Sequence, residues 1–212
     1  MWIPPRGLAP KTDADDPIDY YYRPLTARLY RGRLELAVAL LGEARYRAVL
    51  EVGYGSGVLL PQLTRQADRV VGIDIHAAAS SVADMLDRLG VFAELVQASL
   101  FELPFEAGEF DALVSVSVLE HIVELERALD EMARVLAPGG VAVLGFPVRN
   151  PFTDAFFRAV GYDPRSIHPS SHVDIVTALE RHPLFGIERC TRLPRVLPTS
   201  LSAYVCCRCR RR

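Results

Sequence analysis

A glycine-rich turn follows a short apolar run in the first third of the chain. Residues 49–57 read VLEVGYGSG, with three alternating glycines after an acid. Such a turn at the end of a strand lets the backbone approach a ligand closely, and it commonly cradles a nucleotide. The dinucleotide fingerprint is GxGxxG, whereas this chain has GxGxG, and Val58 stands where the third dinucleotide glycine would be. The spacing therefore speaks against a dinucleotide as the ligand.

The motif E-x-G-x-G-x-G at residues 51–57 resembles the first motif of class I S-adenosylmethionine-dependent methyltransferases. That family places an acid at the end of the second strand to hold both ribose hydroxyls, and Asp74 in VVGIDIH occupies this position. A carboxylate suits the task because it accepts two charge-assisted hydrogen bonds at once. The resemblance is continuous over residues 48–147. LPFEAGEFDALVSVSVLEHI and ALDEMARVLAPGGVAVLGFP are similar to small methyltransferases of the ubiquinone and menaquinone biosynthesis type.

The resemblance implies S-adenosylmethionine as the cofactor and predicts where it binds. Relatives often carry Asp to meet the adenine amino group at the position of Ser99, whose hydroxyl accepts a hydrogen bond more weakly than a carboxylate does. The residues expected to bind the cofactor are Glu51, Gly53, Tyr54, Gly55, Gly57, Asp74, Ile75, Ser99, Leu100 and Ser115.

Histidines and tyrosines are the candidates for the acceptor side. A base is needed only if the acceptor is protonated at neutral pH, and His121 and His172 are the candidates for it. The alternative for His121 is a role in the cofactor pocket or in the fold. Aromatic rings of the N-terminal segment could pack on a flat acceptor or only pin that segment to the surface. The residues expected to contact the acceptor are Tyr21, Tyr22, His168 and His172.

Two functions other than methyl transfer to a small molecule stay open. One is a non-catalytic module that binds S-adenosylmethionine, because a preserved pocket does not prove turnover. The other is an NAD-dependent oxidoreductase. The glycine spacing and the absence of a Tyr-x-x-x-Lys pair argue against it, since Lys11 is the only lysine.

The elements that must position these residues alternate along the chain. Apolar runs of five or six residues separated by amphipathic helices predict parallel strands covered on both faces. We therefore expect a doubly wound, mostly parallel seven-stranded α/β sheet of the Rossmann-like methyltransferase type, with an antiparallel C-terminal edge. The strands are expected at 48–52, 69–73, 92–96, 112–116, 141–146, 187–193 and 201–208, and the first helices at 26–41 and 58–66.

The chain is expected to form one domain at residues 25–212, preceded by an irregular arm at residues 1–24. An insert at about 147–172 is the other material for an acceptor site. It holds a predicted short helix at 154–160 and a loop before a helix at 173–180, for which Ser170 or Ser171 can serve as the cap.

The composition argues against some classes of binding partner. The 212 residues are 50% hydrophobic with a net charge of −2, which argues against a nucleic-acid partner. No uncharged apolar run is long enough to predict a membrane partner. A cytoplasmic protein with four reduced cysteines is expected. No metal site is expected, since Pro169 breaks any helix between His168 and His172 and neighbouring strand cysteines point to opposite faces. The oligomeric state cannot be read from the sequence.

Overall fold

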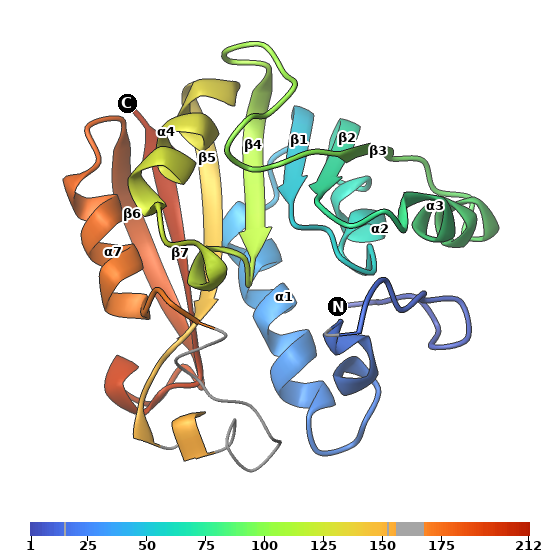
Figure 1. Ribbon diagram of the computed structural model, residues 1–212, viewed down its shortest axis with the longest axis horizontal. Coiled ribbons are helices and arrows are strands. Elements are labelled where there is room, and N and C mark those ends of the chain that lie inside the picture. The colour runs from blue at the N-terminus through green and yellow to red at the C-terminus, as the bar shows by residue number, and fades with distance from the viewer. Residues whose placement is uncertain (15, 152, 156–167) are drawn as a thin grey trace.

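The computed structural model describes residues 1–14, 16–151, 153–155 and 168–212, and these form a mixed seven-stranded sheet between two layers of helices (Figure 1). The strand order is β3-β2-β1-β4-β5-β7-β6. The first five strands in this order are parallel, and β7 pairs antiparallel with both β5 and β6. The predicted fold class is confirmed, including the antiparallel edge. Residues 154 and 155 of the helix predicted at 154–160 are helical, and the rest of that helix and most of the loop after it lie outside the described residues.

The strands are β1 (Tyr46–Val52), β2 (Ala67–Asp74), β3 (Glu94–Gln97), β4 (Phe110–Val116), β5 (Leu136–Pro147), β6 (Phe185–Leu193) and β7 (Tyr204–Arg211). The α-helices are α1 (Ala27–Leu41), α2 (Leu60–Leu63), α3 (Ala79–Arg88), α4 (Leu125–Val135) and α7 (His172–Arg181). Three short 3-10 helices are η1 (Pro17–Tyr21), η2 (Leu119–His121) and η3 (Thr199–Leu201).

Alternate side chains of each buried strand pack into two separate hydrophobic cores, one on each face of the sheet. On β1, Val49 packs with α1, α2 and α3, whereas Leu50 packs with α4 and α7 on the other face. This alternation follows from the two-residue period of a strand and explains why the runs are apolar throughout. Among the described residues, no helix is both long and apolar enough to cross a bilayer.

Several predicted element boundaries differ from the observed ones, and two of the differences have a clear local reason. The helix expected at 58–66 is reduced to α2, because Gly57 has φ +70° and Pro61 fits a helix only in its first turn. Strand β5 starts at Leu136 rather than at Val141. The Pro-Gly-Gly segment follows the end of α4 and is already part of β5. Its pairing with β4 has a register shift between Phe110 and Ala112.

The expectation of four reduced cysteines was wrong. Strands β6 and β7 pair in a register that places Cys190 opposite Cys207, and the two form a disulfide with their Cα atoms 4.1 Å apart. Cys206 and Cys209 are free thiols and buried. Cys206 points to the opposite face from Cys207 and Cys209, as expected for neighbouring strand residues.

A thiol titration checks this pairing. In denaturant without reductant, the chain should expose only the thiols of Cys206 and Cys209, and all 4 cysteines should react after reduction. Cys190→Ser should add the thiol of Cys207 to the unreduced count. It should also lower the free energy of unfolding by about 3 kcal/mol, because the bridge closes a loop in the unfolded chain. Full reactivity without reductant would contradict the disulfide.

The N-terminal segment packs against the sheet's carboxyl edge, where Figure 1 shows it below the strand arrowheads beside α1. Ile18 of η1 is fully buried, and Ile3 and Tyr21 join the same core as α1. Asp16 caps η1 by accepting from the backbone N–H of Ile18, and its other oxygen accepts from the Ser56 hydroxyl at 2.6 Å. The segment is therefore tied directly to the glycine turn.

Candidate functional site

The glycine turn after β1 adopts a conformation that side chains rarely permit. Gly53, Gly55 and Gly57 have φ angles of +75°, +49° and +70°. A Cβ on Gly53 would lie 2.3 Å from Cγ2 of Val118, and one on Gly57 would lie 2.5 Å from Cγ1 of Val82. A Cβ on Gly55 would meet nothing within 4 Å. The outer glycines are thus required by packing, and the middle one faces open space where a ligand can approach.

Asp74 ends β2 next to this turn, and its carboxylate is held by backbone groups. Oδ2 accepts from the N–H of Gly55 at 2.8 Å, and Oδ1 accepts from the N–H of Ile75 at 2.7 Å and of His76 at 3.3 Å. The ring of His76 returns to the turn, with Nε2 lying 3.0 Å from the carbonyl oxygen of Gly55. The structure brings the predicted turn and the predicted acid into direct contact.

Glu51 and Tyr54 present buried polar atoms beside Asp74. Oε2 of Glu51 and the hydroxyl of Tyr54 have no hydrogen-bond partner among the described residues, although Glu51 is only 5% exposed. Burial, followed by the charge of Asp74, raises the pKa of Glu51 well above its usual value, and burial raises the pKa of Tyr54 to about 12. Buried polar groups nearly always have partners, so these two atoms suit a polar ligand at the turn.

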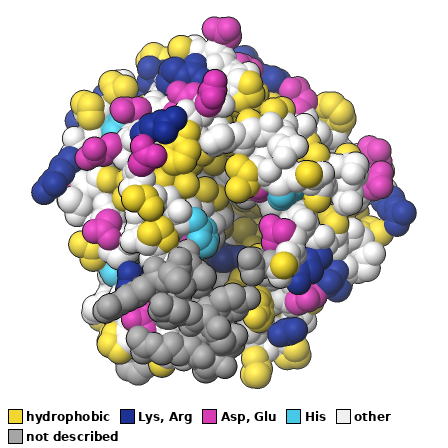
Figure 2. Space-filling view, in the orientation of Figure 1, with side chains coloured by type: hydrophobic (Ala, Val, Ile, Leu, Met, Phe, Trp, Pro, Cys, Tyr) yellow, Lys and Arg dark blue, Asp and Glu magenta, His cyan; other side chains and the backbone are white. Residues whose placement is uncertain are grey.

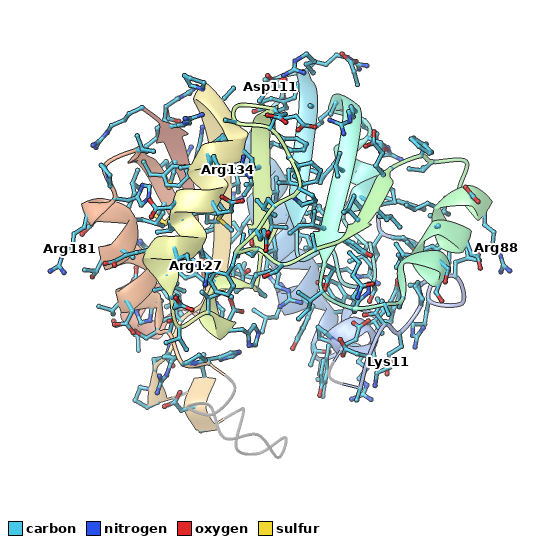
Figure 3. The ribbon with its side chains drawn as sticks, turned by 45° about the horizontal axis from the view of Figure 1, so that its top comes forward. Lys11, Arg88, Asp111, Arg127, Arg134 and Arg181 are labelled. Atoms are coloured by element: carbon cyan, nitrogen blue, oxygen red, sulfur yellow. A yellow bond between two sulfur atoms is a disulfide. The ribbon has the colours of Figure 1, made fainter. Side chains whose placement is uncertain are left out.

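The residues predicted for the adenine side follow β2 and β3. Ile75 is 75% exposed, and Ser99 lies at the surface, where its Oγ accepts from the N–H of Phe101. Leu100 is buried beneath them. Figure 3 shows Arg134 on α4; its guanidinium donates to the carbonyls of Leu103 and Phe105 and so fixes the loop after Ser99.

Ser115, the remaining predicted cofactor residue, lies near the carboxyl end of β4. It is 1% exposed, and its Oγ has no hydrogen-bond partner among the described residues. Ser115 is paired with Val52 across β1 and β4, and its side chain points to the α4 face of the sheet. It therefore offers a further polar atom at the same edge.

A polar network that the sequence analysis missed lies at the end of β4. Ser117 has φ +62°. Its Oγ accepts from Nη1 of Arg33 at 3.0 Å and lies 3.0 Å from the hydroxyl of Tyr204. Nη2 of Arg33 donates to the hydroxyl of Tyr21 at 2.8 Å, and its guanidinium stacks 4.2 Å from the ring centre of Tyr30. An arginine on the apolar face of a predicted helix was the signal available in the sequence.

The predicted acceptor residues divide between this network and its surroundings. Tyr21 belongs to it, whereas Tyr22 turns away and donates to the carbonyl of Pro4 at 2.5 Å. His172 is the first residue of α7, and its Nδ1 accepts from the N–H of Arg149, which leaves Nε2 for other contacts. A cavity of about 450 Å³, lined by Asn150 among others, opens beside His172.

His121 and His168 lie together although they are far apart in the chain. Their ring centres are 5.0 Å apart, and His121 is exposed whereas His168 is buried. Burial, with smaller effects of His121 and Arg149, lowers the pKa of His168 to about 4. Glu120 next to them is 2% exposed, and burial raises its pKa to about 8. Figure 2 shows the face of the molecule that is seen in Figure 1. This face has a hollow near its centre, with histidine and acidic side chains at the rim.

Comparisons with known proteins place this chain in a family. Residues 50–144 match the model of a methyltransferase domain. A ubiquinone biosynthesis O-methyltransferase of Psychrobacter cryohalolentis is 33% identical over 115 residues, which are 50% of this chain and 42% of that protein. A phosphatidylethanolamine N-methyltransferase of Cereibacter sphaeroides is 32% identical over 156 residues, 72% of this chain and 71% of that protein. The chain thus spans less than half the length of the ubiquinone-pathway relatives it matches.

Solved structures share the fold. Geranyl diphosphate C-methyltransferase from Streptomyces coelicolor, in complex with Mg²⁺, geranyl diphosphate and S-adenosyl-L-homocysteine, superposes with a TM-score of 0.72 at 19% identity, covering 88% of this chain and 81% of that one. The N-methyltransferase NodS from Bradyrhizobium japonicum gives 0.67 at 20% identity, covering 97% of both chains. With the glycine turn, Glu51 and Asp74 assembled at one sheet edge, the chain belongs to the class I S-adenosylmethionine-dependent methyltransferases.

Proposed function

We propose that this chain transfers the methyl group of S-adenosylmethionine to a small-molecule acceptor. The observation that carries the proposal is the buried, unpartnered Oε2 of Glu51 beside Asp74 at the open side of the turn. Two carboxyl groups there suit a ligand that carries cationic ammonium and sulfonium groups. A carboxyl group at the position of Glu51 gives no backbone-like donor to the pyrophosphate of a dinucleotide, and the turn has GxGxG in place of GxGxxG, so the oxidoreductase alternative is disfavoured.

The turn and the two acids have separate tasks in this proposal. The open space at Gly55 admits the amino-acid end of the cofactor, and the oriented carboxylate of Asp74 accepts from its ribose hydroxyls. Ile75 offers an apolar surface to the adenine, with Ser99 and Leu100 beyond it. The bound cofactor supplies a methyl group on an already activated sulfonium, so the chain's main contribution is to hold the acceptor in line with it.

We place the acceptor between the N-terminal segment and the residues that follow β4. Arg33, Tyr21 and Ser117 line this side from α1, η1 and the end of β4. The strained backbone of Ser117 supports the assignment, because unfavourable φ values in non-glycine residues cluster at functional sites. Burial, followed by the charge of Glu120, raises the pKa of Tyr204 well above its usual value, so its hydroxyl stays protonated and can donate to an acceptor oxygen.

The acceptor and its reacting atom are questions for a direct screen. The relatives are named for oxygen, nitrogen and carbon methylation, so intermediates of ubiquinone biosynthesis, phosphatidylethanolamine and geranyl diphosphate form the first panel. Transfer of a radiolabelled methyl group to any one of them supports catalysis. A chain that binds the cofactor but methylates none of a broad panel would favour the non-catalytic module. The cytoplasmic location stays a prediction.

Cofactor choice is tested by thermal shift with S-adenosylmethionine, S-adenosylhomocysteine and NADH. A ligand at about 100 times its dissociation constant stabilises by about 2.7 kcal/mol, which should raise Tm by about 5 to 10 °C with the two sulfur compounds. A rise with NADH alone would overturn the proposal.

A matched pair of glycine variants sharpens this test. Gly55→Ala and Gly42→Ala both place a Cβ at positive φ with no protein atom within 4 Å. Both should therefore lose about 1 to 2 kcal/mol of stability from backbone strain. Only Gly55→Ala should lose the ligand-induced shift, because its methyl group would occupy the space of the ligand. If the ligand raised the Tm of the two variants equally, the assignment of the ligand to this turn would be wrong.

A further inference from the structure

Three side chains with metal-binding atoms converge at the end of β4. Glu120 and His121 belong to η2, and His168 precedes α7. One ligand atom from each lies within 4.8 Å of the others. Ligand atoms around a tetrahedral zinc ion lie about 3.3 Å apart, so a movement of at most about 1.5 Å would close the set on an ion. Rotation of the exposed His121 ring can supply that movement.

The backbone holds the two segments together independently of these side chains. The N–H of Ser170 donates to the carbonyl of Glu120 at 3.2 Å, and the Ser170 hydroxyl donates to the carbonyl of Ile122 at 2.5 Å. The adjoining α7 begins with a capping box in which Ser171 and Asp174 exchange hydrogen bonds. His168 is therefore delivered beside η2 by an ordered connection rather than by a chance approach of two surface rings.

Glu120 supplies a second, independent indication of a cation. It is 2% exposed, and its Oε2 has no hydrogen-bond partner among the described residues. A buried carboxyl oxygen without a partner is unusual, and a bound cation would supply the partner. Its own backbone N–H, the charge of Arg33 and the Ser117 hydroxyl also act on this carboxyl group.

The donor set favours a particular class of ion. Two imidazoles with one carboxylate suit zinc and related transition metals, whereas magnesium prefers oxygen ligands throughout. Catalytic zinc sites commonly have three protein ligands and leave one position for water or substrate. The exposed His121 leaves an entry path from solvent. We propose that Glu120, His121 and His168 form a three-ligand site for a divalent transition-metal ion on the acceptor side of the cofactor turn.

The site lies close to the expected reaction. Val118 packs directly against the first glycine of the turn, where a Cβ on Gly53 would be 2.3 Å from its Cγ2, and Glu120 and His121 follow it in η2. A metal ion there would bind an acceptor hydroxyl and lower its pKa, so that the hydroxyl gives its proton to solvent water and its oxygen reacts without a separate base. His121 would then act as a ligand and not as the general base. This role rests on the proposed methyl transfer, whereas binding of the ion does not.

Metal binding is tested on the untagged full chain by calorimetric titration with Zn²⁺ and by the visible absorption of added Co²⁺. We expect one ion per chain and Co²⁺ bands typical of low coordination number. His121→Ala removes an exposed ligand, and Glu120→Gln keeps the size of the buried one. Each should weaken Zn²⁺ binding at least about 100-fold, since even changes outside the ligand shell cost about 10- to 100-fold.

The control variant is His182→Gln, which removes an imidazole that pairs with Asp130 outside this cluster. It should bind Zn²⁺ as the wild type does. Binding of S-adenosylhomocysteine, measured in every variant, shows that the fold and the cofactor turn are intact. Absence of stoichiometric Zn²⁺ binding, binding of Mg²⁺ alone, or Zn²⁺ binding unchanged in both ligand variants would overturn the metal site. If the wild type did not bind S-adenosylhomocysteine, the proposed function would be overturned instead.

Discussion

Asp74→Ala is expected to lose at least about 3 kcal/mol of binding free energy for S-adenosylhomocysteine, or roughly 100-fold in Kd. The carboxylate is expected to accept hydrogen bonds from both ribose hydroxyls, and each bond to a charged group contributes about 1.5 to 3 kcal/mol. Isothermal titration calorimetry measures the loss. The melting temperature of the ligand-free variant shows whether the turn has kept its structure without the bond from the Gly55 N–H to Asp74.

Asp68→Ala is the matched control. Asp68 lies on the same strand near its amino end, and its side chain is 60% exposed and paired with Arg45 at the surface. Exposed ion pairs contribute about 0 to 1 kcal/mol, so neither stability nor Kd should change much. If Asp74→Ala and Asp68→Ala bound S-adenosylhomocysteine equally well, the assignment of the ribose to Asp74 would be wrong.

Gly53→Ala should strongly destabilise the turn. The backbone at φ +75° costs a side chain about 1 to 2 kcal/mol, and the Cβ would lie 2.3 Å from Val118 Cγ2, which adds about 1 to 3 kcal/mol of overpacking. A loss of about 3 kcal/mol should lower Tm by about 6 to 12 °C for a domain of this size. Differential scanning calorimetry without ligand measures it.

Two further variants separate the strain from the clash. Gly42→Ala carries the strain alone, because its Cβ would meet no atom within 4 Å, and it should cost only about 1 to 2 kcal/mol. The double variant Gly53→Ala with Val118→Ala removes the clashing methyl group. It should be less destabilised than the sum of its single changes, since residues in contact do not act additively. An additive result would refute the contact between Val118 and the turn.

The predicted fold follows from patterns that are local in the sequence. Apolar runs bounded by amphipathic helices sufficed for the parallel strands, and the glycine spacing with Glu51 sufficed for the turn. Asp74 could be placed because the family that the chain resembles has an acid at the end of the second strand, and the parallel pairing of β1 with β2 brings that end to the turn. Each of these inferences depends on residues within one strand, one turn or one crossover.

The features that escaped prediction depend on register or on distant segments. The disulfide requires Cys190 to face Cys207, and a shift of one residue along β6 would have turned the side chain to the other face. The proximity of His121 and His168 depends on hydrogen bonds from Ser170 to η2. A local pattern search pairs His168 with His172 instead, because it compares neighbours in the sequence and not in space.

The backbone hydrogen bonds around Asp74 also bear on how fast the cofactor exchanges. Because three N–H groups hold the carboxylate before any ligand arrives, this group loses little conformational freedom on binding and association needs no rearrangement of it. When a site is prepared in this way, differences in affinity come mainly from the dissociation rate. The lifetime of the complex, and not the rate of encounter, is then the quantity that sequence changes in this turn would tune.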